Sequence, residues 1–171
     1  MFFCCLIANE RDYIFSKIDY QQGLSNSAVL CLFQDNTGLM WFGTYDGKTM
    51  EVYRSDFSES KTFSNNVISS IQQADSSCLW ISTHLGINRF STRSREVVCS
   101  YEFDSDYVLH SNEKGNTWVL GYDWIAYYNT YHRQFVQIKV PDVEMLNVDY
   151  RAFVTENGDL YMFPHGSGDY Y

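Results

Sequence analysis

Proline and long hydrophobic runs are scarce in this sequence, which has two prolines among 171 residues. The shortage of proline excludes a proline-rich linker, and the lack of an apolar run of about 20 residues excludes a membrane-spanning helix. Basic residues are also few: 12 lysines and arginines are outnumbered by 21 aspartates and glutamates, for a net charge of −9. Phosphate backbones require a basic surface. We therefore expect no nucleic-acid partner and no electrostatic contact with a membrane surface.

Motifs of catalysis and metal binding are missing as well. The sequence has no phosphate-binding glycine-rich loop, no HExxH pair and no GxSxG elbow. Its four histidines are scattered, and the cysteines beyond residue 8 have no CxxC spacing; they are Cys31, Cys78 and Cys99. Cys31 and Cys78 lie in apolar runs typical of strands, which favours small core residues. We expect no catalytic residue, no metal site and no cofactor.

Residues 1–8 form an uncharged apolar run that ends in the small residue Ala8, directly before the polar segment Asn9–Asp12. The run is too short to cross a bilayer, but it resembles the end of a secretory signal peptide. A buried first strand is the alternative. We expect residues 1–8 to be the remnant of a signal peptide or an apolar leader, and the chain to be exported.

What the sequence does contain is aromatic residues, at 18%, and an internal repeat. Leu24–Asn26 aligns with Phe63–Asn65 when the sequence is shifted by 39 residues, and the same shift places Trp41 on Trp80. It also aligns two further pairs without a gap: Thr44 with Thr83 and Gly47 with Gly86. A repeat of this length predicts an array of small structural units.

Two further copies follow with weaker similarity. Glu113–Val119 matches the segment around Trp41 and contains Trp118, and Glu156–Met162 carries Tyr161 in place of tryptophan. The aromatic positions 41, 80, 118 and 161 are thus 39, 38 and 43 residues apart. We place the repeat boundaries at residues 24–62, 63–103, 104–146 and 147–171, the last copy being incomplete.

Each copy has the pattern of several short strands. In the first copy the predicted strands are Ala28–Gln34, Leu39–Thr44, Lys48–Tyr53 and Ser58–Phe63, and the turn Asp35–Gly38 offers a glycine for positive φ. Four antiparallel strands in about 40 residues are typical of a β-propeller blade. We predict an all-β chain whose residues 9–171 form the N-terminal part of a propeller with about 3.5–4 blades, a partial ring.

The tryptophans Trp41 and Trp80 are predicted to fill the gap between neighbouring blades, because a blade must bury both faces of its sheet. An open ring would expose an apolar face of its last blade. The expected partners are therefore the remaining blades of a parent chain or a second copy in a homodimer.

The segments Gly23–Val29, Gln34–Gly47 and Leu79–Phe90 resemble the two-component-regulator propeller repeat. The resemblance implies the periplasmic sensor region of a hybrid two-component system of Bacteroidetes, with an oligosaccharide as the signal. It also implies membrane contact only through a transmembrane helix of a longer parent chain, and a histidine kinase only in that longer chain. The sequence departs from the family pattern at Lys48–Glu51, and in the third copy at Leu120–Gly121 and Trp124. These departures leave the regularity of the first and third blades open.

The candidate ligand-binding residues lie in loops that a propeller gathers on one face. Aromatic planes beside amides and carboxylates suit a sugar, whose C–H faces stack on rings. The candidates are Tyr45, Asp46, His84, Tyr122, Asp123, Trp124, Asn26 and Asn65. The alternative is that they are ordinary turn residues, the asparagines capping their own turns.

Two other functions compete with the sensor. The same repeats would build a non-catalytic protein-interaction scaffold. Ser111–Trp118 is also similar to the Asp-box turn of sialidase-like propellers, with Glu113 in place of the aspartate, which would suggest a glycosidase with paired carboxylates or a tyrosine nucleophile. In those enzymes, however, the box is a structural hairpin remote from catalysis.

Overall fold

The computed structural model describes residues 18, 21, 24, 28–45, 63–103, 107–121, 124–138 and 150–164. These residues form twelve β-strands and contain no α-helix, which confirms the all-β prediction. No helix of the length and hydrophobicity needed to cross a membrane occurs among them. The apolar leader at residues 1–8 and the predicted strand Lys48–Tyr53 lie outside the described residues, as does the predicted strand Ser58–Phe63 apart from its last residue.

The second and third repeats each form a four-stranded antiparallel sheet with the strands in chain order. The second blade consists of β3 (Ile68–Asp75), β4 (Cys78–Thr83), β5 (Gly86–Ser91) and β6 (Glu96–Tyr101). The third consists of β7 (Tyr107–Ser111), β8 (Thr117–Gly121), β9 (Ile125–Asn129) and β10 (Gln134–Ile138). The third blade pairs without a register shift, so its departures from the family pattern do not disturb the sheet.

The first and fourth repeats are described as antiparallel hairpins. They pair β1 (Val29–Gln34) with β2 (Met40–Thr44), and β11 (Tyr150–Val154) with β12 (Leu160–Pro164). The first two strands predicted for the first repeat are thus confirmed to within one residue. Gly38 closes the first hairpin with φ +87°, a conformation that glycine adopts without strain.

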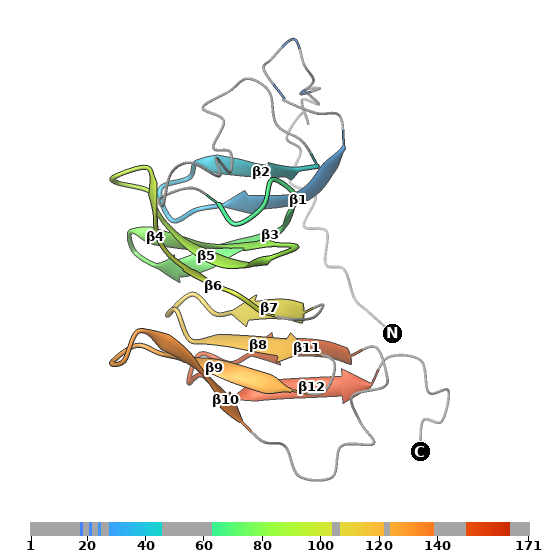
Figure 1. The fold of residues 1–171 in the computed structure, drawn as a ribbon, viewed down its shortest axis with the longest axis vertical. Coiled ribbons are helices and arrows are strands. Elements are labelled where there is room, and N and C mark those ends of the chain that lie inside the picture. The colour runs from blue at the N-terminus through green and yellow to red at the C-terminus, as the bar shows by residue number, and fades with distance from the viewer. Residues whose placement is uncertain are drawn as a thin grey trace, which may run out of the picture.

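The sheets follow one another as the blades of a propeller (Figure 1). Contacts between blades run through their first strands, from β1 to β3, from β3 to β7 and from β7 to β11. The β1–β2 hairpin lies at the top of the stack in Figure 1, and β11–β12 lies beyond the third blade at the other end. The chain is therefore a partial propeller, as predicted.

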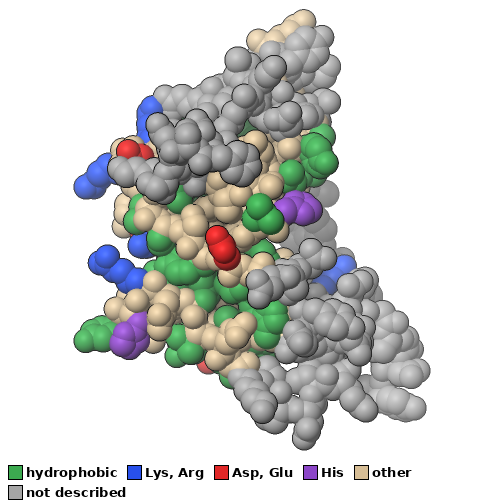
Figure 2. Space-filling view, in the orientation of Figure 1, with side chains coloured by type: hydrophobic (Ala, Val, Ile, Leu, Met, Phe, Trp, Pro, Cys, Tyr) green, Lys and Arg blue, Asp and Glu red, His purple; other side chains and the backbone are tan. Residues whose placement is uncertain are grey.

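The hydrophobic core lies between the blades. One cluster joins the first two blades, where Trp41 meets Phe90 at 5.6 Å between ring centroids, nearly edge to face. A second joins the next two, where the buried Trp80 packs against Leu109 and Val119. Figure 2 shows apolar side chains along this seam. The prediction that the tryptophans pack between blades is confirmed, because a four-stranded sheet has two faces to cover.

The two cysteines expected in the core are found there. Cys78 is buried in the cluster around Trp80, and Cys31 packs against the cluster around Phe90. Burial raises the pKa of both thiols. Hydrogen bonds with the backbone of Gly43 and Ile71 partly offset this rise at Cys31, and the charge of Arg89 partly offsets it at Cys78. Both side chains are therefore neutral packing groups at ordinary pH.

Candidate functional site

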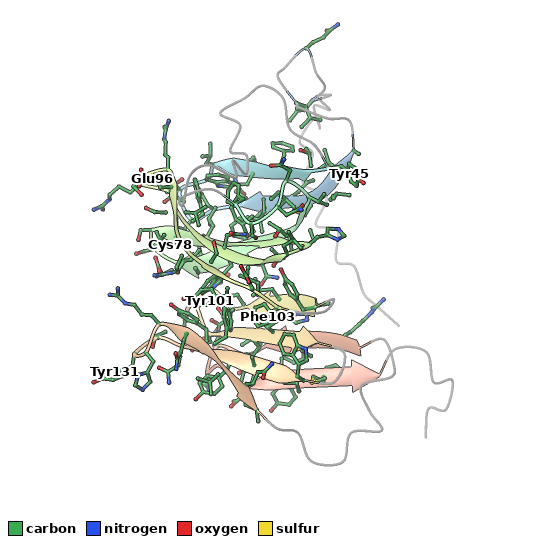
Figure 3. The ribbon with its side chains drawn as sticks, in the orientation of Figure 1. Tyr45, Cys78, Glu96, Tyr101, Phe103 and Tyr131 are labelled. Carbon is green, nitrogen blue, oxygen red and sulfur yellow. The ribbon has the colours of Figure 1, made fainter. Side chains whose placement is uncertain are left out.

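The strand connections place functional side chains at two opposite ends of the blades. One end holds the turns between the second and third strands of the blades, such as the β4–β5 turn, and it also holds Tyr45. We call it the second-turn end. The other end, the first-turn end, holds the turns between first and second strands. Figure 3 shows Tyr45 at one end, and at the other Glu96, the first residue of β6, and Tyr131, in the turn between β9 and β10.

Four of the predicted ligand-binding residues are described, and all four lie at the second-turn end. Tyr45 and His84 are exposed, Tyr45 directly after β2 and His84 in the turn before β5. Asn65 precedes β3, and its side-chain oxygen accepts a 2.8 Å hydrogen bond from the amide of Val67, so it caps its own turn. The other four, Asn26, Asp46, Tyr122 and Asp123, lie outside the described residues.

Trp124 is the predicted site residue with the largest packing role. Its ring stacks on Phe103 with centroids 5.0 Å apart and planes 12° apart, and it packs against the core cluster around Trp80. The ring also occupies the space where a side chain at position 121 would lie, which requires Gly121 there. These contacts of Trp124 therefore anchor its turn to the core.

Sequence reasoning missed the polar centre of this end, which is Asn88 on β5. Asn88 is 0% exposed, and its side chain makes four hydrogen bonds. They join the amide and hydroxyl of Ser64, the carbonyl of Ile81 and the hydroxyl of Ser100, at 2.8–3.3 Å. An asparagine among apolar strand residues was the available signal, since a buried amide requires partners.

The described cavity lies at the first-turn end. It has a volume of about 740 Å³ and is lined by the ends of the four first strands. Its lining combines aromatic, amide, imidazole and carboxylate groups: Phe33, Gln34, Asp35, Asn36, Gln72, Gln73, Asp75, Ser76, His110, Ser111, Asn112, Glu113, Ala152, Phe153 and Val154. The residues predicted from sequence are not among them, so the candidate site has two separate parts.

A recurring turn motif builds the rim of this cavity. In each blade a polar side chain after the first strand accepts backbone amides of the following turn. Asp35 accepts from Thr37 and Leu39 at 2.9 and 3.0 Å, and Asn112 accepts from Lys114 and Asn116 at 3.0 and 2.9 Å. Asp75 and Thr155 each accept one such amide. In the segment that resembles an Asp-box the capping residue is thus Asn112, while Glu113 is exposed.

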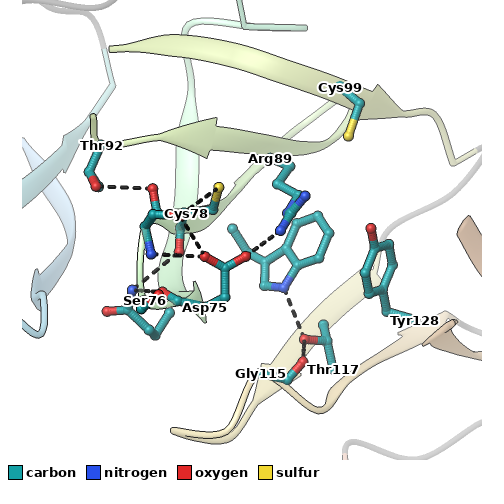
Figure 4. Close-up of polar contacts among 12 residues, drawn as sticks. Asp75, Ser76, Cys78, Arg89, Thr92, Cys99, Gly115, Thr117 and Tyr128 are labelled. Atoms are coloured by element: carbon teal, nitrogen blue, oxygen red, sulfur yellow. Dashed lines mark hydrogen bonds and ion pairs between the residues drawn. The ribbon is translucent and has the colours of Figure 1, made fainter. Parts of the chain in front are cut away.

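The carboxylates of the rim are held in their charged form. Burial would raise the pKa of Asp35, but hydrogen bonds from Thr37, Trp41 and Leu39 outweigh it and hold the pKa below its ordinary value. At Asp75 the same balance holds, with the Ser77 amide and the Arg89 guanidinium opposing burial. Figure 4 shows Asp75 bonded to Arg89. The Thr117 hydroxyl, labelled in the same view, accepts a hydrogen bond from the Trp80 indole at 2.9 Å.

Several polar side chains of the lining remain open to a ligand, His110 and Glu113 among them. The side chains of His110 on β7 and Glu113 in the next turn make no hydrogen bond within the described residues, and Phe153 on the neighbouring strand β11 is half-exposed. No group of three potential metal ligands occurs in the described ranges. The arrangement therefore suits a neutral polar ligand that offers hydroxyl groups and apolar C–H faces.

We expect His110 to make stability depend on pH. Burial lowers its pKa below the ordinary value of 6.5, so the unfolded chain binds more protons than the folded chain as the pH falls below about 6.5. The free energy of unfolding should fall over that range and level off above it. Urea unfolding at about pH 7.5 and pH 5.5 measures the change. His110→Gln should reduce the change in unfolding free energy between these two pH values. His132→Gln replaces a histidine in an exposed turn and should leave the change as it is. An unchanged pH dependence in His110→Gln would contradict its assignment to His110.

Comparison with known proteins gives one family and one fold. The family described as "Two component regulator propeller" matches residues 23–46. The fold is similar to the extracellular domain of BT4673 from B. thetaiotaomicron, described as a hybrid two-component system, with a TM-score of 0.57 and 19% identity. A second structure of BT4673, described as a one-component system, gives a TM-score of 0.54 and 17% identity.

These structures are much longer than the chain. The similarity covers 84% of this chain but only 19% and 20% of the two structures. No curated protein sequence matches the chain. The chain is a partial β-propeller that carries a two-component regulator propeller repeat at residues 23–46, as the resemblance in its sequence indicated.

Proposed function

We propose that this chain is the ligand-sensing propeller segment of a hybrid two-component signalling protein and acts in the periplasm. The proposal draws on the repeat at residues 23–46 and on the likeness to an extracellular domain of such a system. Membrane anchoring and kinase activity would belong to other parts of a longer parent chain.

The ligand that we propose is an oligosaccharide. The observation that carries this proposal is the cavity of about 740 Å³, within the range of about 300–1,000 Å³ that small ligands occupy. Phe153 offers an aromatic plane, and His110 and Glu113 offer hydrogen-bonding groups that the fold leaves open. A sugar presents both a C–H face and hydroxyls, so it can use both kinds of group at once.

The cavity supports binding rather than glycoside cleavage. A glycosidase needs one carboxylic acid with a raised pKa, so that it can donate a proton to the leaving oxygen. The pKa values of Asp35 and Asp75 are lowered instead, and both carboxylates are engaged in capping turns. We therefore propose that the segment is not catalytic.

Calorimetric titration with a panel of short plant and host oligosaccharides tests the proposal. We expect binding by the native chain, and at least about tenfold weaker binding by the double variant His110→Ala, Glu113→Ala, which corresponds to about 1.4 kcal/mol. The matched double variant Tyr45→Ala, His84→Ala should bind normally.

If only the second pair of substitutions weakens binding, the ligand sits at the second-turn end that the sequence predicted. If no saccharide binds, the oligosaccharide proposal is wrong and a protein-interaction scaffold becomes the better account.

A further inference from the structure

One position of the repeat contributes a side chain to the cavity from each of the four repeats. It is the residue on the first strand that pairs across the sheet with the aromatic residue of the repeat. The pairs are Phe33 with Trp41, Gln72 with Trp80, His110 with Trp118 and Phe153 with Tyr161. The first residue of each pair lines the cavity. The chemistry at this one position therefore decides much of what the cavity offers to a ligand.

At this position of the second blade, Gln72 uses both polar atoms of its side chain to hold the next blade. Its Nε2 donates to the carbonyl of Leu109 at 2.6 Å, and its Oε1 accepts from the amide of Ser111 at 2.6 Å. These two backbone groups belong to the residues directly before and after His110 on β7. The carboxamide of Gln72 thus grips β7 on both sides of His110.

The grip replaces a strand partner. β7 is an edge strand of its sheet and pairs only with β8. An edge strand has a row of backbone groups that no neighbouring strand satisfies, and such groups need other partners when they are enclosed. The carboxamide supplies one acceptor and one donor, which is what the Ser111 amide and the Leu109 carbonyl require.

The bonds of Gln72 bear on the direction of the His110 side chain. Successive side chains of a strand point to opposite sides. Leu109 packs in the cluster around Trp80, and the hydroxyl of Ser111 donates to a carbonyl of β3 at 2.9 Å, so both point toward the second blade. His110 therefore points toward the fourth repeat, whose strand β11 contacts β7. Since its imidazole makes no hydrogen bond within the described residues, the backbone of β7 determines where it lies.

We propose that Gln72 is a positioning residue of the candidate site, which fixes the imidazole of His110 in the cavity by holding β7 on both sides of it. Gln72 acts through His110 and needs no contact with the ligand. The consequence for binding rests on the oligosaccharide function proposed above. A group that is already fixed loses less freedom when a ligand binds, so the affinity should depend on Gln72.

Gln73 offers a matched control. It is the next residue on β3 and lines the same cavity. Its side chain also bonds to backbone groups: it accepts from the amide of Asn36 at 3.3 Å and donates to the carbonyl of Cys78 at 3.2 Å and to that of Asp75. None of these partners is on β7. Gln73→Met should therefore remove hydrogen bonds at the cavity without releasing His110.

NMR of the 171-residue chain tests the proposal without a ligand, with the imidazole signals of His110 assigned through His110→Gln. Gln72→Met keeps an unbranched side chain but cannot hold both backbone groups. The His110 signals should shift and broaden, and its pKa should rise toward the ordinary value of 6.5 as the ring leaves its buried place. The amide of Ser111 should exchange faster with solvent. Gln73→Met should leave the His110 signals and the pKa of His110 as they are.

Gln72→Glu is the second variant, for the case that Gln72→Met does not fold. It keeps an acceptor for the Ser111 amide but places a carboxylate against the Leu109 carbonyl, so it should displace His110 as well.

Calorimetric titration with the saccharide that the native chain binds gives the effect on affinity. Gln72→Met should bind about fivefold more weakly, the change that one ordinary hydrogen bond corresponds to. Gln73→Met should bind like the native chain.

Unchanged His110 signals in both Gln72 variants would overturn the proposal, whatever stability these variants lose. Displaced signals with an unchanged affinity, or equal weakening in Gln73→Met, would overturn the role of Gln72 in binding. A native chain that binds no saccharide would overturn the oligosaccharide function alone, because the spectra decide the placement of His110 independently.

Discussion

Replacing Trp80 with alanine is expected to lower the free energy of unfolding by about 4 kcal/mol. The side chain is 1% exposed and joins two blades, with Tyr128 at 4.8 Å and Phe135 at 5.5 Å between ring centroids. Alanine removes these contacts and leaves a cavity between the sheets that neither sheet can fill alone. Because domains of this size are stable by about 5–15 kcal/mol, much of the total stability is lost. Urea unfolding followed by circular dichroism measures the change.

Two variants define what the Trp80 result means. Trp80→Phe keeps much of the ring packing but loses the 2.9 Å bond to Thr117, so it should cost less than alanine. Tyr131→Ala removes a ring that is 89% exposed and should change stability by no more than about 0.5 kcal/mol. If Trp80→Ala cost no more than Tyr131→Ala, the packing of neighbouring blades would not be what stabilises the fold.

The second large effect is expected at Asn88. Asn88→Leu keeps the number of side-chain heavy atoms but leaves the Ser64 amide, the Ile81 carbonyl and the Ser100 hydroxyl without their partner. A buried polar group without a hydrogen bond costs about 1–3 kcal/mol, so we expect a loss of about 3 kcal/mol or more. Thermal and urea unfolding at neutral pH measure this loss.

Asn65→Ala is the matched control for Asn88. It removes an asparagine at the same end of the blade that accepts one amide, from Val67, so it should cost about 1 kcal/mol. Similar losses in the two variants would show that the four buried hydrogen bonds of Asn88 stabilise the fold no more than the single hydrogen bond of Asn65.

The repeat made much of the fold predictable. The shift that aligns Trp41 with Trp80 predicted where strands begin and end, and it predicted that both rings pack between blades. Periodicity of two along a strand is local, so the sequence shows it directly. The same reasoning placed Cys31 and Cys78 in the core correctly.

The candidate site was less predictable. The first-turn cavity is formed by Phe33, His110 and Phe153, which are more than 40 residues apart along the chain. Each residue alone looks like part of an ordinary strand. Likewise, the sequence matched Glu113 to the acidic position of a box-like turn, whereas the backbone geometry uses Asn112, because that side chain reaches the amides of Lys114 and Asn116.

The repeat, the all-β blades and the packing of Trp41 and Trp80 between blades could be predicted from the sequence, because they depend on side-chain spacing within a single blade. The end of the blades that holds the cavity, and the stacking of Trp124 on Phe103, are seen only in the folded molecule. Those features depend on the distances between strands of different blades, and these distances are set by packing rather than by any local pattern.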